Sequence, residues 1–248
     1  MSKSITEFIR RGNNTYKTGA YVSVLNIKAH LAELSSEIEA NLEIVSRKYR
    51  KNDPGRYLYR LFFQGHYNND VFAEESLELI YVTLVAWGMR SRAASLSEFE
   101  KFKESVLENE SSIKSLKGLR IESISEGDCK DLLGELKSLF DKLELTKPDK
   151  PKLVTFSKAM HFLLPNLVVP MDRKYTMKYF LDYTTFSGNN EKMFELYKSI
   201  YIEFVTFSRE HPELSKFLNN DWNQTIPKIM DNLIIGHILK NPEEKENL

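Results

Sequence analysis

Cysteine is nearly absent from the sequence, and long apolar runs and net charge are absent altogether. The single cysteine, Cys129, cannot form a disulfide within the chain, which is typical of proteins from a reducing compartment. The most apolar run, Leu77–Gly88, is interrupted by Glu78 and falls short of the roughly 18 apolar residues that a membrane helix needs. The first residues lack the apolar core of a secretory signal. We therefore expect a cytoplasmic protein without membrane contact.

The charges of the chain balance, because 35 lysines and arginines face 35 aspartates and glutamates. This balance argues against a protein that coats nucleic acid by charge alone. The distribution is less even, since the stretch from Leu145 to Phe180 holds seven basic residues and two acidic ones. Such a stretch is compatible with binding a polyanion at one face, although solvated helix faces also produce it.

Apolar residues recur at helical spacing along most of the chain, and the ten glycines and eight prolines stand mostly between these periodic segments. Strand signals are limited to two short pieces, Lys152–Val154 and Leu167–Val169. We predict an all-α protein, either two-lobed or a single compact multi-helix domain. The expected helices are Val22–Arg50, Gly55–Gln64, Glu74–Trp87, Leu96–Asn109, Cys129–Leu143, Thr155–Leu163, Lys174–Tyr183, Glu191–Ser208, Pro212–Leu218 and Ile226–Leu239.

A linker is predicted at Lys147–Pro151, where two prolines favour an extended backbone. It divides an N-terminal helical lobe, residues 1–146, from a C-terminal helical lobe, residues 147–248.

The most informative segment runs from Thr155 to Phe180. Lys158 and His161 lie one turn apart on a short predicted helix, which is followed by a turn and an extended apolar piece. Asp172 directly precedes the next helix, where a carboxylate accepts hydrogen bonds from free backbone N–H groups. A lysine near one helix start and an aspartate at the next are therefore expected to face one crevice.

This segment resembles the catalytic segment of the helix-hairpin-helix DNA glycosylase superfamily, in particular its 8-oxoguanine glycosylase branch. The resemblance is carried by Lys158-Ala-Met-His-Phe-Leu163 and Val168-Val-Pro-Met-Asp-Arg173, about a tenth of the chain. It implies a glycosylase-like helical fold, DNA as the partner and no cofactor. It also implies that Lys158 is a Schiff-base nucleophile and that Asp172 stabilises charge on the sugar. Residues 151–157 contain no glycine, so the glycine-bearing hairpin that precedes the lysine in that superfamily is missing.

A second stretch, from Ala86 to Leu96, contains Trp-Gly-Met followed by two arginines. Together with the first segment it is similar to uncharacterised prokaryotic proteins of this size. Arginine binds phosphate bidentately, so Arg90, Arg92 and Arg173 are candidate contacts to the DNA backbone.

An exposed lysine amine is almost fully protonated at neutral pH, so attack on a sugar carbon requires burial or a neighbouring cation. His161 is the candidate for that neighbour or for a proton carrier. A damaged base must leave the duplex and stack in a pocket, for which Trp87, Phe156 and Tyr175 are the candidate walls.

Each candidate also has a plain structural interpretation. Lys158 fits a solvated helix-face lysine or an ion pair, Asp172 fits an N-cap, and His161 fits a hydrogen-bonded core histidine. Gly88 fits a helix C-cap with cations placed favourably after it. The histidines show no metal-ligand spacing, so no metal site is predicted.

The leading hypothesis is therefore a DNA glycosylase-like protein that acts on a damaged base, such as an oxidised one, through a lysine nucleophile. The alternatives are a non-catalytic helical nucleic-acid-binding module and a protein–protein interaction protein.

Overall fold

The computed structural model describes residues 24–67, 70–89, 95–181 and 189–240 of the chain. These residues form helices and connections, as the periodicity predicts, and the all-α class is confirmed. In the described part of the chain, pairing of the β type is limited to an isolated antiparallel bridge between Leu96 and Thr146.

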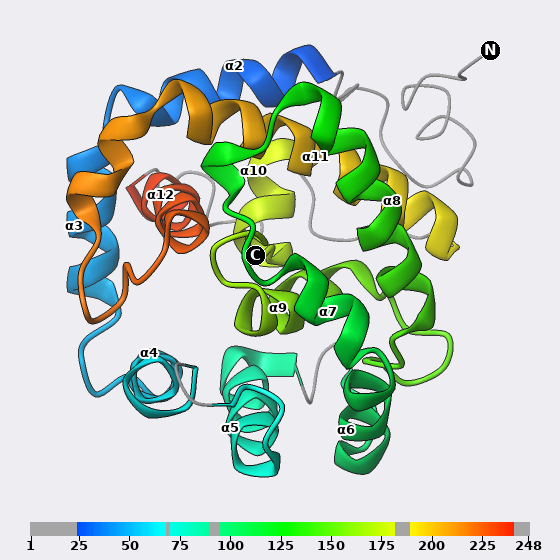
Figure 1. The fold of residues 1–248 in the computed structure, drawn as a ribbon. Helices are drawn as coiled ribbons and strands as arrows, with labels where there is room; N and C mark the ends of the chain where they lie inside the picture. Colours follow the sequence, from blue (N-terminus) through cyan, green and yellow to red (C-terminus); the bar gives the residue numbers. More distant parts are fainter. Residues whose placement is uncertain (1–23, 68–69, 90–94, 182–188, 241–248) are drawn as a thin grey trace, which may run out of the picture.

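The elements follow one another along the chain as labelled in Figure 1. The α-helices are α2 (Val24–Ser35), α3 (Ile38–Lys48), α4 (Pro54–Leu61), α5 (Glu74–Leu84), α6 (Phe99–Glu108), α7 (Glu110–Leu116), α8 (Glu126–Lys142), α9 (Leu153–Leu163), α10 (Lys178–Leu181), α11 (Asn190–Glu210) and α12 (Ile226–Lys240). Three short π-helices, called π-turns below, are η1 (Phe62–His66), η2 (Val85–Met89) and η4 (Arg173–Met177). Two short 3-10 helices are η3 (Ile121–Ser123) and η5 (Pro212–Phe217).

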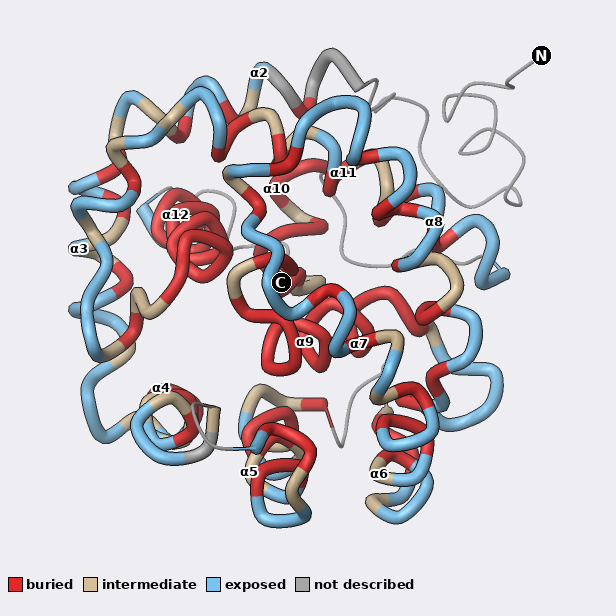
Figure 2. Tube along the Cα trace, viewed as in Figure 1, coloured by how far each residue is buried: buried red, intermediate tan, exposed pale blue. Residues whose placement is uncertain are grey.

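Helices α9, α10 and α12 lie in the interior of the molecule, and the other helices are arranged around them (Figure 1). Every residue of α9 is buried, and so is every residue of α12 from Ile226 to Ile238. Figure 2 shows these two helices buried along their length, whereas α2, α3, α8 and α11 are buried on one side and exposed on the other. A helix that is covered on all sides needs an apolar sequence, and any charged residue on it needs a partner.

Helix α8 shows how the outer helices are specified by sequence. Its buried apolar residues recur at three- and four-residue spacing from Cys129 to Phe140, which gives one apolar stripe facing the core. Burying each leucine of such a stripe contributes about 1.5–3 kcal/mol. The hydroxyl of Ser125 accepts a hydrogen bond from the N–H of Asp128 and thereby caps the first turn.

Helix α3 packs along α12 at very short range. A Cβ added to Gly236 would lie 2.1 Å from the carbonyl oxygen of Asn41 and 2.6 Å from its carbonyl carbon. The two backbones therefore touch where Gly236 lies, and a larger residue does not fit there without moving a helix.

The predicted helix Val22–Arg50 is divided in the structure, because α2 ends at Ser35 and α3 begins at Ile38. The hydroxyls of Ser35 and Ser36 donate to the carbonyls of Ala32 and Glu33. Serine side chains that bond to nearby carbonyls compete with the helical pattern, which explains the break. Helix α7 was not predicted.

Elements on both sides of the predicted division at residue 147 pack against each other. Helix α3 contacts α12, and α2 contacts both α11 and α12. At the linker itself, the N–H of Lys147 donates to the carbonyl of Ser95.

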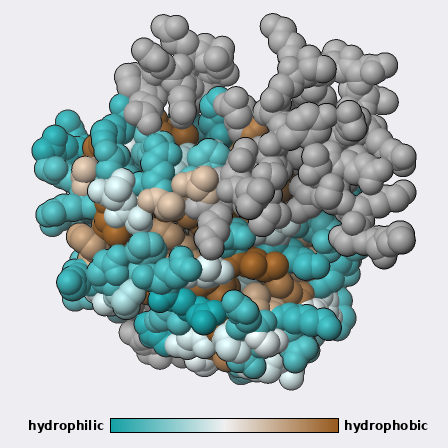
Figure 3. Space-filling model, turned by 90° about the horizontal axis from the view of Figure 1, so that it is seen from above, coloured by the Kyte–Doolittle hydropathy of each residue, from teal (hydrophilic) through white to brown (hydrophobic). Residues whose placement is uncertain are grey.

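The surface is mixed. Figure 3 shows hydrophilic side chains over most of the visible described surface, with hydrophobic ones mainly in recesses between them. None of the described helices combines the length and the apolar character that crossing a bilayer requires.

Candidate functional site

Two of the central helices each carry a buried lysine. Lys158 lies on α9 and Lys228 on α12, and they are only 6% and 2% exposed. Lysine is rarely buried to this extent, because moving an ammonium group out of water costs several kcal/mol unless a partner compensates. Each of the two lysines has an aspartate as that partner.

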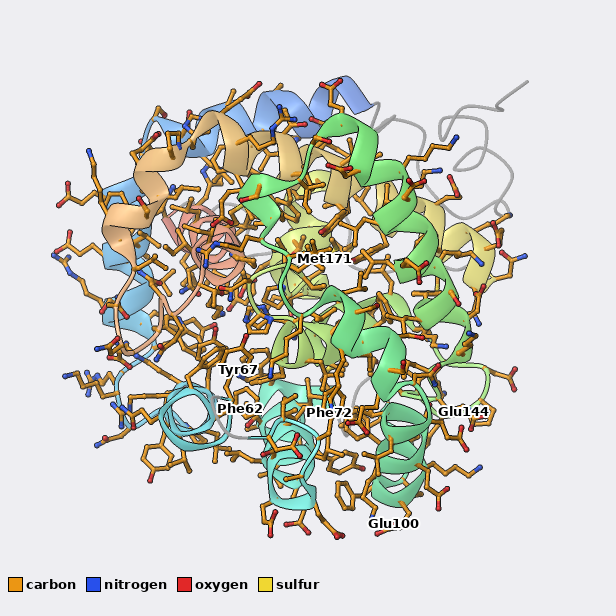
Figure 4. The ribbon with its side chains drawn as sticks, in the orientation of Figure 1. Phe62, Tyr67, Phe72, Glu100, Glu144 and Met171 are labelled. Atoms are coloured by element: carbon orange, nitrogen blue, oxygen red, sulfur yellow. The ribbon has the colours of Figure 1, made fainter. Side chains whose placement is uncertain are left out.

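Lys158 donates to Asp172 over 2.5 Å from Nζ to Oδ2. Figure 4 shows Met171, the residue before this aspartate, at the centre of the molecule. The other carboxylate oxygen accepts the N–H of Lys174 over 2.7 Å, and the backbone N–H of Asp172 donates to Thr176. Asp172 therefore caps η4 and holds the lysine at the same time, so its carboxylate is fixed in position.

The charge of Lys158 controls the ionisation of Asp172. Burial by itself raises the pKa of a carboxyl group, but the charge and hydrogen bond of Lys158 more than offset this effect. The N–H groups at the start of η4 act in the same direction. The net pKa of Asp172 is lowered, so the carboxylate is ionised at neutral pH.

Lys228 donates to Asp231, three residues later on α12, with 2.5 Å between Nζ and Oδ2. Its ammonium lies 4.1 Å from the ring centroid of Trp222, 5.3 Å from that of Trp87 and 5.8 Å from that of Tyr59. Burial lowers the pKa of Lys228 and raises that of Asp231, although the attraction between them acts against both changes.

The two ion pairs line one pocket of about 290 Å³. Trp87 stands beside both ammonium groups, since the Nζ of Lys158 lies 5.7 Å from its ring. The pocket is lined by Tyr49, Asp53, Gly55, Ala86, Trp87, Gly88, Lys158, Pro170, Asp172, Lys174, Tyr175, Trp222, Lys228, Asp231 and Ile235.

Two π-turns contribute to the walls of the pocket. Turn η2 carries Trp87 and Gly88, and turn η4 carries Tyr175. Gly88 has φ of 82°, in the left-handed region that glycine adopts without strain, so the helix bends directly after the tryptophan.

The rim of the pocket is tied together by hydrogen bonds across the fold. The hydroxyls of Tyr49 and Tyr175 lie 2.6 Å apart and link the end of α3 to η4. The carbonyl of Tyr49 accepts a hydrogen bond from the guanidinium of Arg56, which also pairs with Asp221 over 2.6 Å. These bonds fix the positions of Tyr49 and Tyr175 relative to each other.

Four of the residues predicted from sequence meet in this pocket: Lys158, Asp172, Trp87 and Tyr175. Phe156 does not line it, because its ring packs against Phe140 and Tyr197, with centroids 5.0 and 5.5 Å away. Arg173 begins η4 beside the pocket without lining it, whereas Lys174 lines it. Arg90 and Arg92 lie outside the described residues.

His161 lies behind the pocket wall, fully buried. Its Nδ1 lies 2.7 Å from the carbonyl oxygen of Val168, so Nδ1 carries the proton, and Nε2 accepts from the hydroxyl of Tyr59 over 3.0 Å. Burial lowers its pKa to about 3. The expected role as a neighbouring cation is wrong, because the ring is neutral at physiological pH. Its contacts instead hold Tyr59, whose ring stacks with that of Trp87.

Several residues that line the pocket were not predicted from the sequence, among them Lys228, Asp231 and Trp222. A signal was present, because Lys228 and Asp231 are the charged residues within a largely apolar helical run from Ile226 to Ile235. Two opposite charges at i and i+3 on a buried helix indicate an internal ion pair.

Comparison with known proteins adds no assignment: no protein-family model, no curated protein and no solved structure matches this chain. Among the described residues, no cluster of three or more histidine, cysteine or acidic side chains is suited to a metal ion.

The ion pair between Lys158 and Asp172 should make the stability of the fold depend on pH. Because the folded-state pKa of Asp172 is lowered, its ionised form stabilises the fold at pH values above the ordinary pKa of 3.8. This stabilisation is lost as the pH falls through the lower folded-state value. We expect Asp172→Asn to reduce the free energy of unfolding by about 2 kcal/mol at pH 7.

Urea unfolding of wild type and Asp172→Asn between pH 7 and pH 3 measures this effect. The difference between the two proteins should shrink below pH 3.8. A difference that stays constant over the whole range would show that the lost stability does not come from the ionised pair.

Proposed function

We propose that this protein is a DNA glycosylase-type enzyme that removes a damaged base through an amine nucleophile, Lys158. The observation that carries the proposal is the 2.5 Å contact between Lys158 and Asp172 in a pocket walled by tryptophan and tyrosine. An amine, a fixed carboxylate and aromatic surfaces are the groups that excision of an extruded base requires.

In the proposed reaction, Lys158 and Asp172 act one after the other. The ammonium of Lys158 passes one proton to Asp172, and the freed amine forms a bond to C1′ of the deoxyribose. The bond from C1′ to the base breaks with its electron pair on the base, which takes the proton from Asp172. Once the base has taken its proton, Asp172 is a carboxylate again and stabilises the positive charge on the nitrogen that is now attached to C1′.

A Schiff base follows. A proton moves from the attached nitrogen to the ring oxygen, the bond between C1′ and that oxygen breaks, and a protonated imine joins Lys158 to the opened sugar. The protein then holds a covalent intermediate that a hydride donor reduces to a stable amine.

The aromatic residues supply the space for the base. Trp87, Trp222 and Tyr175 line a pocket whose volume lies near the lower end of the range for small-ligand sites, roughly 300–1,000 Å³. That size suits one extruded base rather than a longer stretch of nucleic acid.

We propose that DNA contacts the protein on the side where the pocket lies. Lys174 lines the pocket and Arg173 begins the same turn, so two cations stand next to the catalytic pair. The basic stretch from Leu145 to Phe180 supports a local attraction for phosphate on a chain without net charge. A repair role requires the protein to share a compartment with DNA, which in a prokaryotic cell is the cytoplasm.

The test is borohydride trapping with duplex oligonucleotides. One duplex carries an abasic site, others carry single lesions including 8-oxoguanine, and one is undamaged. We expect a covalent adduct with the abasic duplex and with at least one lesion, and none with the undamaged duplex. Salt-sensitive binding of undamaged DNA without any adduct would instead favour a non-catalytic nucleic-acid-binding module.

A further inference from the structure

A second concave surface, the α3 groove, adjoins the central pocket. It has a volume of about 570 Å³ and lies where the end of α3, the turn η4 and the end of α12 meet. Lys174 and Tyr175 of η4 line both the groove and the central pocket. The hydroxyl of Tyr175 lies 2.6 Å from that of Tyr49, which fixes this shared wall. A strand that lies along the groove therefore passes directly beside the pocket.

The charged residues that line the groove are all cationic in the described part of the chain. They are Arg47 and Lys48 at the end of α3 and Lys174 of η4. This charge is local, because the whole chain carries 35 basic and 35 acidic residues. The central pocket differs, since three aspartates, Asp172 among them, line it together with its lysines. A phosphate group is therefore attracted to the groove, whereas the carboxylates of the pocket repel it.

The cations of the groove are available to a ligand. The side chain of Arg47 is 75% exposed, and Lys48 and Lys174 are exposed as well. Arg47 pairs with Glu43 one turn earlier on α3, and an ion pair between exposed side chains contributes only about 0–1 kcal/mol. Arg47 can therefore exchange this carboxylate for a phosphate, which a guanidinium binds bidentately.

We propose that the α3 groove binds the phosphodiester backbone of the DNA strand that carries the extruded base, through Arg47, Lys48 and Lys174. The inference rests on the proposed function, because it takes DNA as the partner, and it adds the surface that positions the strand. The phosphates bound are those next to the extruded nucleotide, because the groove and the pocket share Lys174 and Tyr175. Contacts of this kind set the register of the strand and do not read its sequence.

The first experiment measures binding without chemistry. A labelled duplex that carries tetrahydrofuran, a stable abasic-site analogue, is titrated with protein over a range of KCl concentrations, and binding is followed by fluorescence anisotropy. The variant Arg47→Gln/Lys48→Gln removes two exposed cations, so the fold is retained. We expect its affinity to fall about tenfold or more at about 0.1 M salt. The slope of log K against log salt should decrease by about 1.8, because two phosphate contacts are lost.

The matched control is Lys130→Gln/Lys142→Gln. It changes the net charge by the same amount, and both lysines are exposed residues of α8, with Lys142 in the last turn of its helix as Lys48 is in α3. Helix α8 lies on the other side of the molecule from α3 (Figure 1). Affinity and salt slope should stay at the wild-type values. Equal losses in the two variants would come from net charge alone and would overturn the inference.

A second experiment locates the phosphates. Duplexes carry uncharged methylphosphonates either at the two phosphates that flank the abasic-site analogue or at two phosphates near the end of the same strand. We expect the flanking replacement to weaken wild-type binding several-fold and to have a much smaller effect in Arg47→Gln/Lys48→Gln, because the same contacts are already lost. Losses that simply add, for the flanking phosphates as for the terminal ones, would overturn the inference.

The outcomes separate the two proposals. Wild type that does not bind the duplex even at low salt overturns both. Wild type that binds through the groove but forms no borohydride adduct with an abasic duplex overturns the proposed chemistry and leaves the groove as a DNA-binding surface. Adduct formation by wild type, combined with unchanged affinity and salt slope in Arg47→Gln/Lys48→Gln, overturns the groove alone.

Discussion

Gly236→Ala is expected to remove about 3 kcal/mol or more of the free energy of unfolding. The added methyl would lie 2.1 Å from the carbonyl oxygen of Asn41, and this neighbour is backbone, so it cannot rotate away. Helices α3 and α12 would have to separate along their contact. Folded domains are stable by only about 5–15 kcal/mol, so the loss is a large part of the total.

Gly134→Ala is the matched control. It makes the same change inside α8, where an added Cβ meets nothing within 4 Å. Alanine favours a helix over glycine by roughly 0.5–1 kcal/mol, so this variant should be slightly more stable than wild type. Urea denaturation of the three proteins gives the comparison, and equal midpoints for wild type and Gly236→Ala would refute the close helix contact.

Lys158→Ala is expected to abolish the borohydride adduct with abasic DNA. The reason is chemical rather than structural, because the variant has no amine at the position that faces Asp172. The loss should be complete within detection, whereas a lysine with only a structural role would lower the yield in proportion to the unfolded fraction. Gel analysis of the trapped complex measures it, with thermal unfolding of the same samples alongside.

Lys152→Ala is the control for burial. Lys152 is 7% exposed, close to the 6% of Lys158, and burial lowers its pKa. Its amine bonds to the carbonyl of Asp141 and lies over the ring of Phe140, away from the pocket. Adduct formation should survive this change, and a loss in both variants would point to general damage of the fold.

Local patterns were sufficient to predict the helical class and the position of Asp172. The free N–H groups at the start of a helix need a hydrogen-bond acceptor, and a side chain next to them in the sequence supplies it. The sequence alone is therefore enough to place an aspartate such as Asp172 at a helix start. The break between α2 and α3 depends on whether Ser35 and Ser36 turn their hydroxyls back to the chain, and periodicity does not report that choice.

The composition of the pocket was harder to predict, because its residues come from distant parts of the chain. Trp222 and Lys228 share a pocket with Lys158 only when α12 packs along α3 and η4, and that packing includes the close contact at Gly236. For Phe156 the prediction was wrong in the other direction, because a residue close to Lys158 in the sequence lies outside the pocket. Its place near Lys158 in the sequence suggested a pocket wall, but helical rotation turns its ring toward Phe140.

His161 illustrates why spacing alone does not assign a role. One helical turn from Lys158 is close enough for a cationic neighbour, yet the ring is enclosed and bonded to Val168 and Tyr59. The environment decides its charge, and that environment includes residues a hundred positions away in the chain.

The central claim is that the amine of Lys158 is the group that bonds to the sugar. Proteolysis of the borohydride-trapped wild-type complex, followed by mass spectrometry, identifies the modified residue directly. We predict the mass of the reduced sugar on Lys158. An adduct on Lys228, on an exposed lysine or on the N-terminal amine would contradict the claim.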